Sequence, residues 1–260
     1  MSTKIQALNQ AKPVTSLTKL AEGVYQVTIL RPNISPQLVR EFHEHLDALE
    51  ALKPQQMSLI TTSAHPKVFC AGMNFKYFDT ATREDFNTFN HNFSRLLARI
   101  VVLGFPTIAA INGFCIGSGL MLAMAHDFRY LVDTPGAILC MPEVEHGISL
   151  PYSCMSLFKK KLVGNVVQKL ILECQRFGRD EALAVDLVQK VVPQGQLIGA
   201  CLGLMEQLLP KSVHSEILSS IKQVLYEDIV DDCKLRFHMD DKLLDYFLNV
   251  RKHASKLSHG

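Results

Sequence analysis

The sequence has no excess of charge of one sign and no long hydrophobic run. Its 260 residues include 27 Lys and Arg against 25 Asp and Glu, a formal net charge of +2. This balance argues against a nucleic-acid-binding protein, which usually carries a clustered basic face. The best apolar run, residues 100–111, contains Gly104, Pro106 and Thr107 and is shorter than the roughly 20 residues that cross a bilayer. We therefore expect neither nucleic-acid binding nor a membrane span.

The sequence also lacks a disulfide framework, a repeat and a low-complexity linker. Seven cysteines are scattered along the chain, and an odd number cannot all pair. We interpret them as reduced thiols that fill the core, which indicates a reducing compartment. With 48% hydrophobic and 20% charged residues, the composition is that of a globular chain and excludes a disordered protein.

The two ends of the chain carry weak signals for location. Residues 1–20 contain Lys4, Lys12 and Lys19 but neither acid nor arginine, so they resemble a mitochondrial presequence only weakly, and a disordered N-terminus is an equal alternative. Residues 255–257 spell the peroxisomal tripeptide Ser-Lys-Leu, but residues 258–260 follow it, and the receptor reads a free C-terminus. The mitochondrial matrix and the peroxisome both stay open as locations.

Short apolar strands alternate with amphipathic helices through the first two thirds of the chain. The pattern predicts strands at 24–30, 57–62, 107–111, 130–132 and 137–140, and helices at 36–52, 83–103 and 120–126. From residue 153 onward the pattern is mostly helical, with amphipathic stretches near 212–230 and 233–255. Such alternation followed by a helical tail indicates an α/β fold with a helical appendage.

Two glycine-containing loops each follow an apolar strand and precede a helical pattern. They are residues 69–74 (FCAGMN) and 112–119 (NGFCIGSG). Small residues let a ligand approach the backbone, and a helix start presents unpaired N–H groups with positive potential. Two such N–H groups from separate strands could hold a carbonyl oxygen as it gains charge. Taken alone, each loop is better explained as an ordinary strand-to-helix turn, and neither fits a phosphate-binding, dinucleotide or nucleophile-elbow pattern.

A third polar segment, residues 141–147 (MPEVEHG), follows another short strand. If it is extended, Glu143 and Glu145 point to opposite faces, so at most one faces a site built by the preceding loops. His146 is either a partner of Glu143 or, as the better-supported alternative, a histidine of a surface turn.

In their order and spacing, these three segments resemble the crotonase superfamily of enoyl-CoA hydratases and isomerases. The resemblance runs from about Val24 to about Pro193. It implies an α/β fold with a crotonase-type ββα spiral core at residues 1–200. It also implies a helical C-terminal region at residues 201–260 that carries subunit contacts, as in the homotrimers and hexamers common in the superfamily.

The resemblance further implies which residues form the site. The backbone N–H groups of Met73 and Ser118 would form an oxyanion hole for a thioester carbonyl, and Glu143 would be the catalytic carboxylate. The implied contacts to the CoA part of an acyl-CoA substrate are Cys70, Ala71, Gly72, Lys76 and Gly117. CoA would enter with the substrate, so neither a separate cofactor nor a metal ion is expected. As thiols, Cys70 and Cys115 are interpreted as packing residues and not as nucleophiles.

One expected carboxylate of the hydratases is absent. These enzymes use a second glutamate in the helix after the second loop, where this chain has Met121, and methionine has no acid–base function. One carboxylate with an oxyanion hole suffices for a 1,3-proton shift. Residues 123–128 and 141–148 are also similar to the Δ3-Δ2-enoyl-CoA isomerase branch. We therefore predict an enoyl-CoA isomerase of fatty-acid β-oxidation.

Two alternatives stay open at this point. One is another crotonase reaction on acyl-CoA, such as thioester hydrolysis. The other is a catalytically silent crotonase fold that serves as a structural subunit of a larger assembly, for example a mitochondrial one. His126-Asp127 is interpreted as structural and the run Lys159-Lys160-Lys161 as a solvated helix face.

Overall fold

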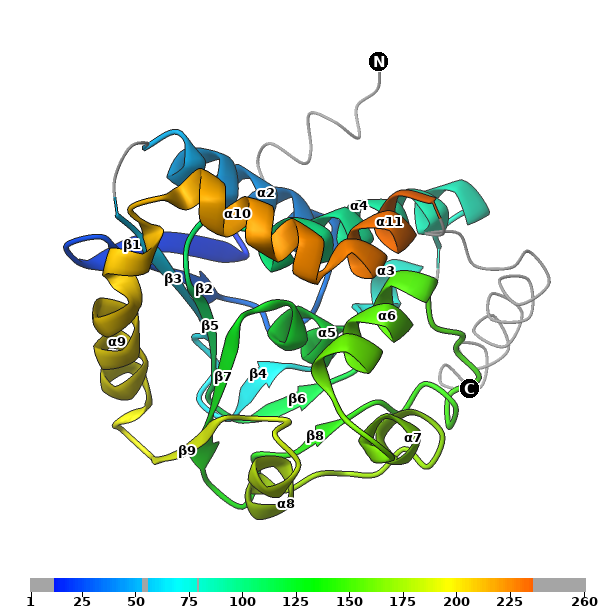
Figure 1. Cartoon of the computed structure of the whole chain (residues 1–260). Coiled ribbons are helices and arrows are strands. Elements are labelled where there is room, and N and C mark those ends of the chain that lie inside the picture. Colours follow the sequence, from blue (N-terminus) through cyan, green and yellow to red (C-terminus); the bar gives the residue numbers. More distant parts are fainter. Residues whose placement is uncertain (1–11, 53–55, 79, 236–260) are drawn as a thin grey trace.

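A computed structural model describes residues 12–52, 56–78 and 80–235 (Figure 1). The Ser-Lys-Leu tripeptide, the first 11 residues and most of the predicted stretch at 233–255 lie outside the described residues. Within the described ranges, no helix combines the length and the apolar character that crossing a membrane requires.

A six-stranded sheet forms the larger layer of the core. Its spatial order is β1-β2-β3-β5-β7-β9, where β1 is antiparallel to β2 and every other neighbouring pair is parallel. Most of its strands are short and largely buried, as parallel sheets require. Their bounds are β1 Thr15–Ala21, β2 Val24–Ile29, β3 Ser58–Ser63, β5 Thr107–Ile111, β7 Phe128–Asp133 and β9 Lys190–Pro193.

A smaller parallel sheet lies beside the first and positions the three segments that were singled out in the sequence. Its order is β4 (Val68–Cys70), β6 (Phe114–Ile116) and β8 (Leu139–Cys140). Each of these strands comes directly after a strand of the large sheet, so the chain repeats a strand–strand–helix spiral. Because the three strands are parallel, their carboxyl ends lie at one edge, and the segments that follow them meet there.

The helices that cover the sheets begin at recognisable caps. Before α2 (Pro36–Glu50), the Ser35 side chain accepts a hydrogen bond from the backbone N–H of Leu38. Before α4 (Arg83–Val101), Thr82 and Asp85 form a reciprocal capping box. Between the sheets and the outer helices lie the short α3 (Phe75–Phe78) and the fully buried α5 (Ser118–Ala125).

The remaining helices are C-terminal to β8. They are α6 Tyr152–Lys161, α7 Val166–Ile171, α8 Arg179–Ala184, α9 Leu197–Leu208, α10 Ser215–Leu225 and α11 Glu227–Leu235, with a short 3-10 helix, η1, at Leu209–Ser212. Helix α9 covers the large sheet, while α10 and α11 run across the top of the view, where α11 packs on α6 and α4 (Figure 1). The domain boundary predicted at residue 200 falls inside α9.

The structure corrects the sequence prediction in three places. Part of the N-terminus expected to be disordered is the edge strand β1, which is fixed where the backbone N–H groups of Val14 and Thr15 donate to Glu41 Oε2 at 2.9 and 2.8 Å. Strand β6 occupies the middle of the predicted loop at 113–119, and β9 interrupts the helical region after residue 153. These strands have weak apolar patterns, and their pairing with neighbours decides their structure.

Candidate active site

A largely apolar cavity lies at the edge where β4, β6 and β8 end. The segments that follow these strands, together with α4, form its walls. The residues that line it are Ala71, Gly72, Met73, Phe75, Phe86, Phe89, Asn90, Phe93, Ile116, Gly117, Ser118, Met121, Pro142, Glu143, His146, Ile148, Ser149, Leu150 and Pro151. A cavity of this kind, apolar with a few converging polar groups, is typical of a small-molecule site.

Two glycines allow the three segments to approach each other closely. A β-carbon at Gly117 would lie 2.8 Å from Glu143 Oε1 and 4.0 Å from the Cα of Gly72. A β-carbon at Gly72 would lie 4.0 Å from the backbone nitrogen of Ser118. Both glycines have positive φ, 82° for Gly72 and 53° for Gly117, a conformation that side chains oppose. The glycines therefore bring the two loops and the Glu143 carboxylate together.

Backbone hydrogen bonds leave the N–H group of Met73 available. The first loop lies against the chain after β2, where Ile34 N donates to Gly72 O and Asn74 N donates to Ile34 O, both at 2.8 Å. In this bridge the Gly72 carbonyl and the Asn74 N–H are oriented toward Ile34. The N–H of Met73 shares a trans peptide with the Gly72 carbonyl and therefore points the other way. Among the described residues, none accepts a hydrogen bond from Met73 N.

The N–H group of Ser118 is similarly available for a different reason. Ser118 is the first residue of α5, and Gly117 at its N-cap provides no side-chain cap. The first N–H groups of a helix have no partner within the helix and lie at its positive end. No acceptor for Ser118 N is present in the part of the chain that the structure describes. The two available N–H groups thus come from separate loops at one cavity.

Glu143 is the buried carboxylate of the site. Its side chain is 8% exposed, and burial raises its pKa to about 7. Its Oε2 atom has no hydrogen-bond partner among the described residues. By contrast, Glu145 lies at the surface and forms an ion pair with Arg176 at 3.0 Å, which lowers the pKa of Glu145. The segment forms a turn rather than an extended strand, yet only Glu143 faces the cavity. His146 is an exposed turn residue at the rim.

Some predicted site residues lie outside this cavity lining. Cys70 is fully buried, and burial raises the pKa of its thiol to about 12, so it packs beneath the loop. Lys76 lies exposed on α3. Ala71, Gly72, Met73, Gly117, Ser118 and Glu143 all line the cavity, as does Met121 at the position that lacks a carboxylate.

Asn90 lines the cavity and was not predicted from the sequence. It is 6% exposed on α4, and its Nδ2 atom has no hydrogen-bond partner within the described ranges. A buried amide without a partner is rare in proteins and points to a ligand or water. The signal in the sequence is a polar residue between Phe89 and Phe93 in the apolar stripe of the helix.

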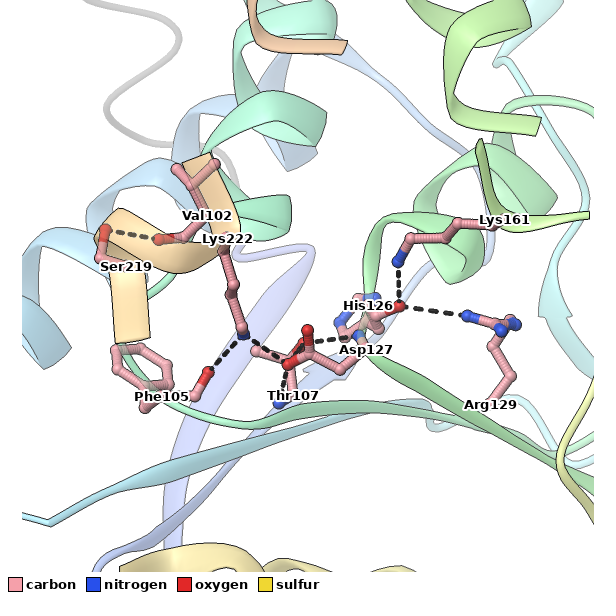
Figure 2. Close-up of polar contacts among 9 residues, drawn as sticks. All are labelled: Val102, Phe105, Thr107, His126, Asp127, Arg129, Lys161, Ser219 and Lys222. Atoms are coloured by element: carbon pink, nitrogen blue, oxygen red, sulfur yellow. Dashed lines mark hydrogen bonds and ion pairs between the residues drawn. The ribbon is translucent and has the colours of Figure 1, made fainter. Parts of the chain in front are cut away.

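The other end of α5 has a different chemistry (Figure 2). The carbonyl of His126 accepts hydrogen bonds from Lys161 Nζ at 2.6 Å and from Arg129 Nη1 at 3.1 Å. The Asp127 carboxylate accepts from Lys222 Nζ at 2.6 Å and from the backbone N–H of Thr107 at 2.9 Å. Cations at a helix C-terminus complement its negative end.

The imidazole of His126 is structural, as expected. Its Nδ1 is 2.9 Å from the carbonyl of Leu122 and its Nε2 is 2.8 Å from Thr61 Oγ1. Burial lowers the pKa of His126 to about 4, so the neutral ring donates from Nδ1 and accepts at Nε2. Lys159 and Lys160 are exposed, as predicted for a solvated helix face. Lys161 departs from that prediction, because its Nζ atom is directed inward to the His126 carbonyl, and burial lowers the pKa of its ammonium to about 7.

Comparisons with known proteins agree with this architecture. A family model described as enoyl-CoA hydratase/isomerase matches residues 19–257. The chain is 28% identical over 194 residues to the Arabidopsis thaliana protein "Enoyl-CoA delta isomerase 2, peroxisomal", covering 71% of this chain and 80% of that protein. It is 30% identical over 207 residues to the Mus musculus protein "Enoyl-CoA hydratase domain-containing protein 2, mitochondrial", covering 76% and 69% respectively.

The structure of human mitochondrial delta3-delta2-enoyl-CoA isomerase superposes with a TM-score of 0.73 at 20% identity, covering 95% of this chain and 98% of that one. This likeness confirms the predicted crotonase-type fold with its C-terminal helical region.

Proposed function

This chain belongs to the enoyl-CoA hydratase/isomerase family, and on that premise we propose that it is a Δ3-Δ2-enoyl-CoA isomerase that acts on unsaturated fatty acyl-CoA. The observation that carries the proposal is that Glu143, the one carboxylate among the described residues that line the cavity, shares that cavity with two available backbone N–H groups. The apolar Met121 lines the same cavity, at the position where the hydratases are expected to carry a second carboxylate.

In the proposed reaction, the thioester carbonyl oxygen accepts hydrogen bonds from Met73 N–H and Ser118 N–H. Glu143 removes a proton from C2 of a 3-enoyl-CoA, and the electron pair spreads into a dienolate whose charge rests largely on that oxygen. The same carboxyl then returns the proton to C4, leaving a 2-enoyl-CoA. Each N–H is worth about 3 kcal/mol in comparable sites. No water molecule is consumed, which agrees with the apolar lining.

The buried environment suits a carboxylate that both takes and returns a proton. A base works best when its pKa lies near the working pH, and burial raises the pKa of Glu143 to about 7. An ordinary carboxylate would be too weak a base for a C2 proton. We therefore expect kcat/KM to rise with pH through about 7 and to level off above it.

The test is conversion of 3-hexenoyl-CoA by the wild-type chain and by Glu143→Gln. We expect the substitution to lower kcat by about 10²- to 10⁴-fold, the usual contribution of a general base. Glu145→Gln is the matched control, because Glu145 lies two residues away but at the surface; its turnover should stay unchanged. Turnover that survives Glu143→Gln would contradict the assignment of the base.

The same assay separates the two alternatives. A thioesterase would release free CoA thiol, which a thiol reagent detects, whereas an isomerase conserves the thioester. A silent structural subunit would neither turn over the substrate nor bind CoA. We also propose that Ala71, Gly72, Lys76 and Gly117 lie along the path of the CoA part, with no separate cofactor, whereas the fully buried Cys70 supports the loop from beneath.

Location and assembly are proposed on the basis of the relatives. Proteins named as peroxisomal and as mitochondrial are both among them, which fits either the peroxisome or the mitochondrial matrix. A homotrimer or hexamer is proposed from the family, with contacts in the region from residue 201. Fractionation of cells that express the tagged chain would decide the location.

A further inference from the structure

A second hollow lies on another face of helix α4 from the candidate active site. It is a surface groove of about 360 Å³ where α2 and α4 pack side by side (Figure 1), and we name it the α2–α4 groove. Its lining includes Val39 and His43 of α2, Tyr77 of α3, and Thr88, Phe89 and Asn92 of α4. The reaction proposed above makes no use of this groove.

Phe89 is the one side chain among the described residues that lines both the cavity of the candidate site and the α2–α4 groove. At 3.6 residues per turn, Phe86 and Phe93 share the face of α4 that meets the cavity. Thr88 and Asn92 share the face that meets the groove. Phe89 lies between these two faces and is only 3% exposed. Its ring is therefore the partition between the cavity and the groove.

The cavity on the catalytic side of Phe89 is small. Its volume is about 80 Å³, whereas an apolar cavity that holds one benzene molecule measures about 150 Å³. The α4 side of the cavity is closed by buried aromatic residues. Phe89 and Phe93 stack there with ring centroids 6.0 Å apart and ring planes inclined by 6°, a favourable aromatic geometry that holds the ring of Phe89 in place.

We propose that Phe89 sets the acyl-chain length that the cavity accepts, so that the protein takes short-chain acyl-CoA and excludes long chains. This inference rests on the proposed function in that a thioester carbonyl lies at the N–H groups of Met73 and Ser118. From there the CoA part leaves past the exposed rim at His146, and the acyl chain extends toward the buried aromatic face of α4. Because Phe89 closes that end, a longer chain has to displace its ring.

The position of the groove predicts what removal of this ring does. Without the ring of Phe89, the cavity joins a hollow more than four times its volume, where Val39 and the ring of Tyr77 offer apolar surface to the distal part of a long chain. Shortening Phe93 adds space within the cavity alone, since Phe93 does not line the groove. The two stacked phenylalanines are therefore a matched pair for a test.

The first test measures binding of hexanoyl-CoA and dodecanoyl-CoA by isothermal titration calorimetry to the wild-type chain, Phe89→Ala and Phe93→Ala. Both acyl groups are saturated, so isomerisation does not affect the readout. We expect the wild-type chain to bind dodecanoyl-CoA at least about tenfold more weakly than hexanoyl-CoA, since one methylene in an apolar pocket already changes affinity by this factor. Phe89→Ala should reverse the order, and Phe93→Ala should keep it. Equal or tighter binding of dodecanoyl-CoA by the wild-type chain would overturn the proposal, as would the same reversal in both variants.

A second substitution tests whether the long chain enters the α2–α4 groove. Thr88 is exposed and lines the groove but not the cavity, so Thr88→Trp in the Phe89→Ala background fills the space that the ring had closed off. We expect the affinity gained for dodecanoyl-CoA to be lost and that for hexanoyl-CoA to stay unchanged. A gain that survives Thr88→Trp would overturn the groove as the path. If Phe89→Ala does not fold, Phe89→Leu keeps an apolar side chain and should shift the preference in the same direction by less.

Turnover measurements separate the role of Phe89 from the proposed function. A wild-type chain that binds hexanoyl-CoA more tightly than dodecanoyl-CoA but does not convert 3-hexenoyl-CoA would overturn the isomerase proposal and support the role of Phe89. Conversion of 3-hexenoyl-CoA and 3-dodecenoyl-CoA with equal kcat/KM would overturn the role of Phe89 and support the isomerase. A wild-type chain that binds neither acyl-CoA would overturn both proposals.

Discussion

The two ends of the buried helix α5 differ in whether the buried polar groups near them have partners in the protein. At its N-terminal end, the N–H of Ser118 and the Oε2 of Glu143 have no protein partner among the described residues. At its C-terminal end, the His126 carbonyl and the Asp127 carboxylate are each contacted by cations. Satisfied buried groups stabilise a fold, and open ones are retained where a ligand binds. The difference indicates which end serves stability and which serves chemistry.

The largest effect is expected from breaking the C-terminal end with Lys222→Met. This leaves the Asp127 carboxylate, which is 15% exposed, without its cation. Removing one partner of a buried ion pair costs about 3–5 kcal/mol, and we expect the lower end of that range because Thr107 still donates to Asp127. Urea unfolding at pH 7 measures the loss. Lys160→Met, an exposed lysine on α6, is the control and should change stability by less than about 0.5 kcal/mol. If Lys222→Met lowered the unfolding free energy by less than about 1 kcal/mol, the C-terminal end of α5 would not be the end that stabilises the fold.

The next effect has the opposite sign and depends on pH. Burial raises the pKa of Glu143 to about 7 from 4.5, so the folded state keeps this proton more firmly than the unfolded chain. The resulting stability is fully present below pH 4.5 and is lost as pH rises through 7. Glu143→Gln avoids that loss, and we expect it to be more stable than wild type by up to about 3 kcal/mol at pH 8 and by little at pH 4.5.

Unfolding of both chains at the two pH values checks this expectation. Glu145→Gln provides the control, because Arg176 lowers the pKa of Glu145 and its removal should give no gain at pH 8. If Glu143→Gln were less stable than wild type at pH 8, the ionised carboxylate would have a stabilising partner in the folded protein, which contradicts the expectation.

The smallest effect is expected at Asn90. Asn90→Leu removes a buried amide without a partner, so we expect a gain of about 1 kcal/mol in unfolding free energy, together with about a tenfold fall in kcat/KM if the amide serves the substrate. Ser94→Ala is the control on the same helix, since Ser94 Oγ is paired with Ser153 Oγ at 3.2 Å and its removal should lower stability. If both substitutions changed the unfolding free energy in the same direction, the distinction between an unpaired amide at Asn90 and a paired hydroxyl at Ser94 would be wrong.

The sequence was sufficient for the features that depend on local pattern. Strands and helices with clear apolar periodicity, such as α2 and α4, were predicted within two residues at their ends. The three segments of the site were found because glycines and a carboxylate follow short apolar strands. The spacing of Glu143 and Glu145 predicted that at most one of them faces the site. The reasoning assumed an extended segment, whereas the structure has a turn there.

Features that depend on tertiary partners could not be predicted. Lys161 stands in a run of three lysines that is typical of a solvated face, and only the nearby His126 carbonyl explains its burial. The amphipathic pattern near 212–230 predicted a helix but not that its polar face would be the buried one. That orientation depends on Asp127 and on the carbonyls of Val102 and Phe105, which lie about a hundred residues earlier in the chain.

The small parallel sheet has a consequence for how the protein acquires its activity. Met73, Ser118 and Glu143 each follow a different strand of β4, β6 and β8, so no local stretch of chain contains the whole site. Contacts between distant segments form late because the intervening chain must first be ordered. Partly folded forms that contain native helices would therefore lack the site, and recovery of turnover during refolding would report the assembly of all three strands.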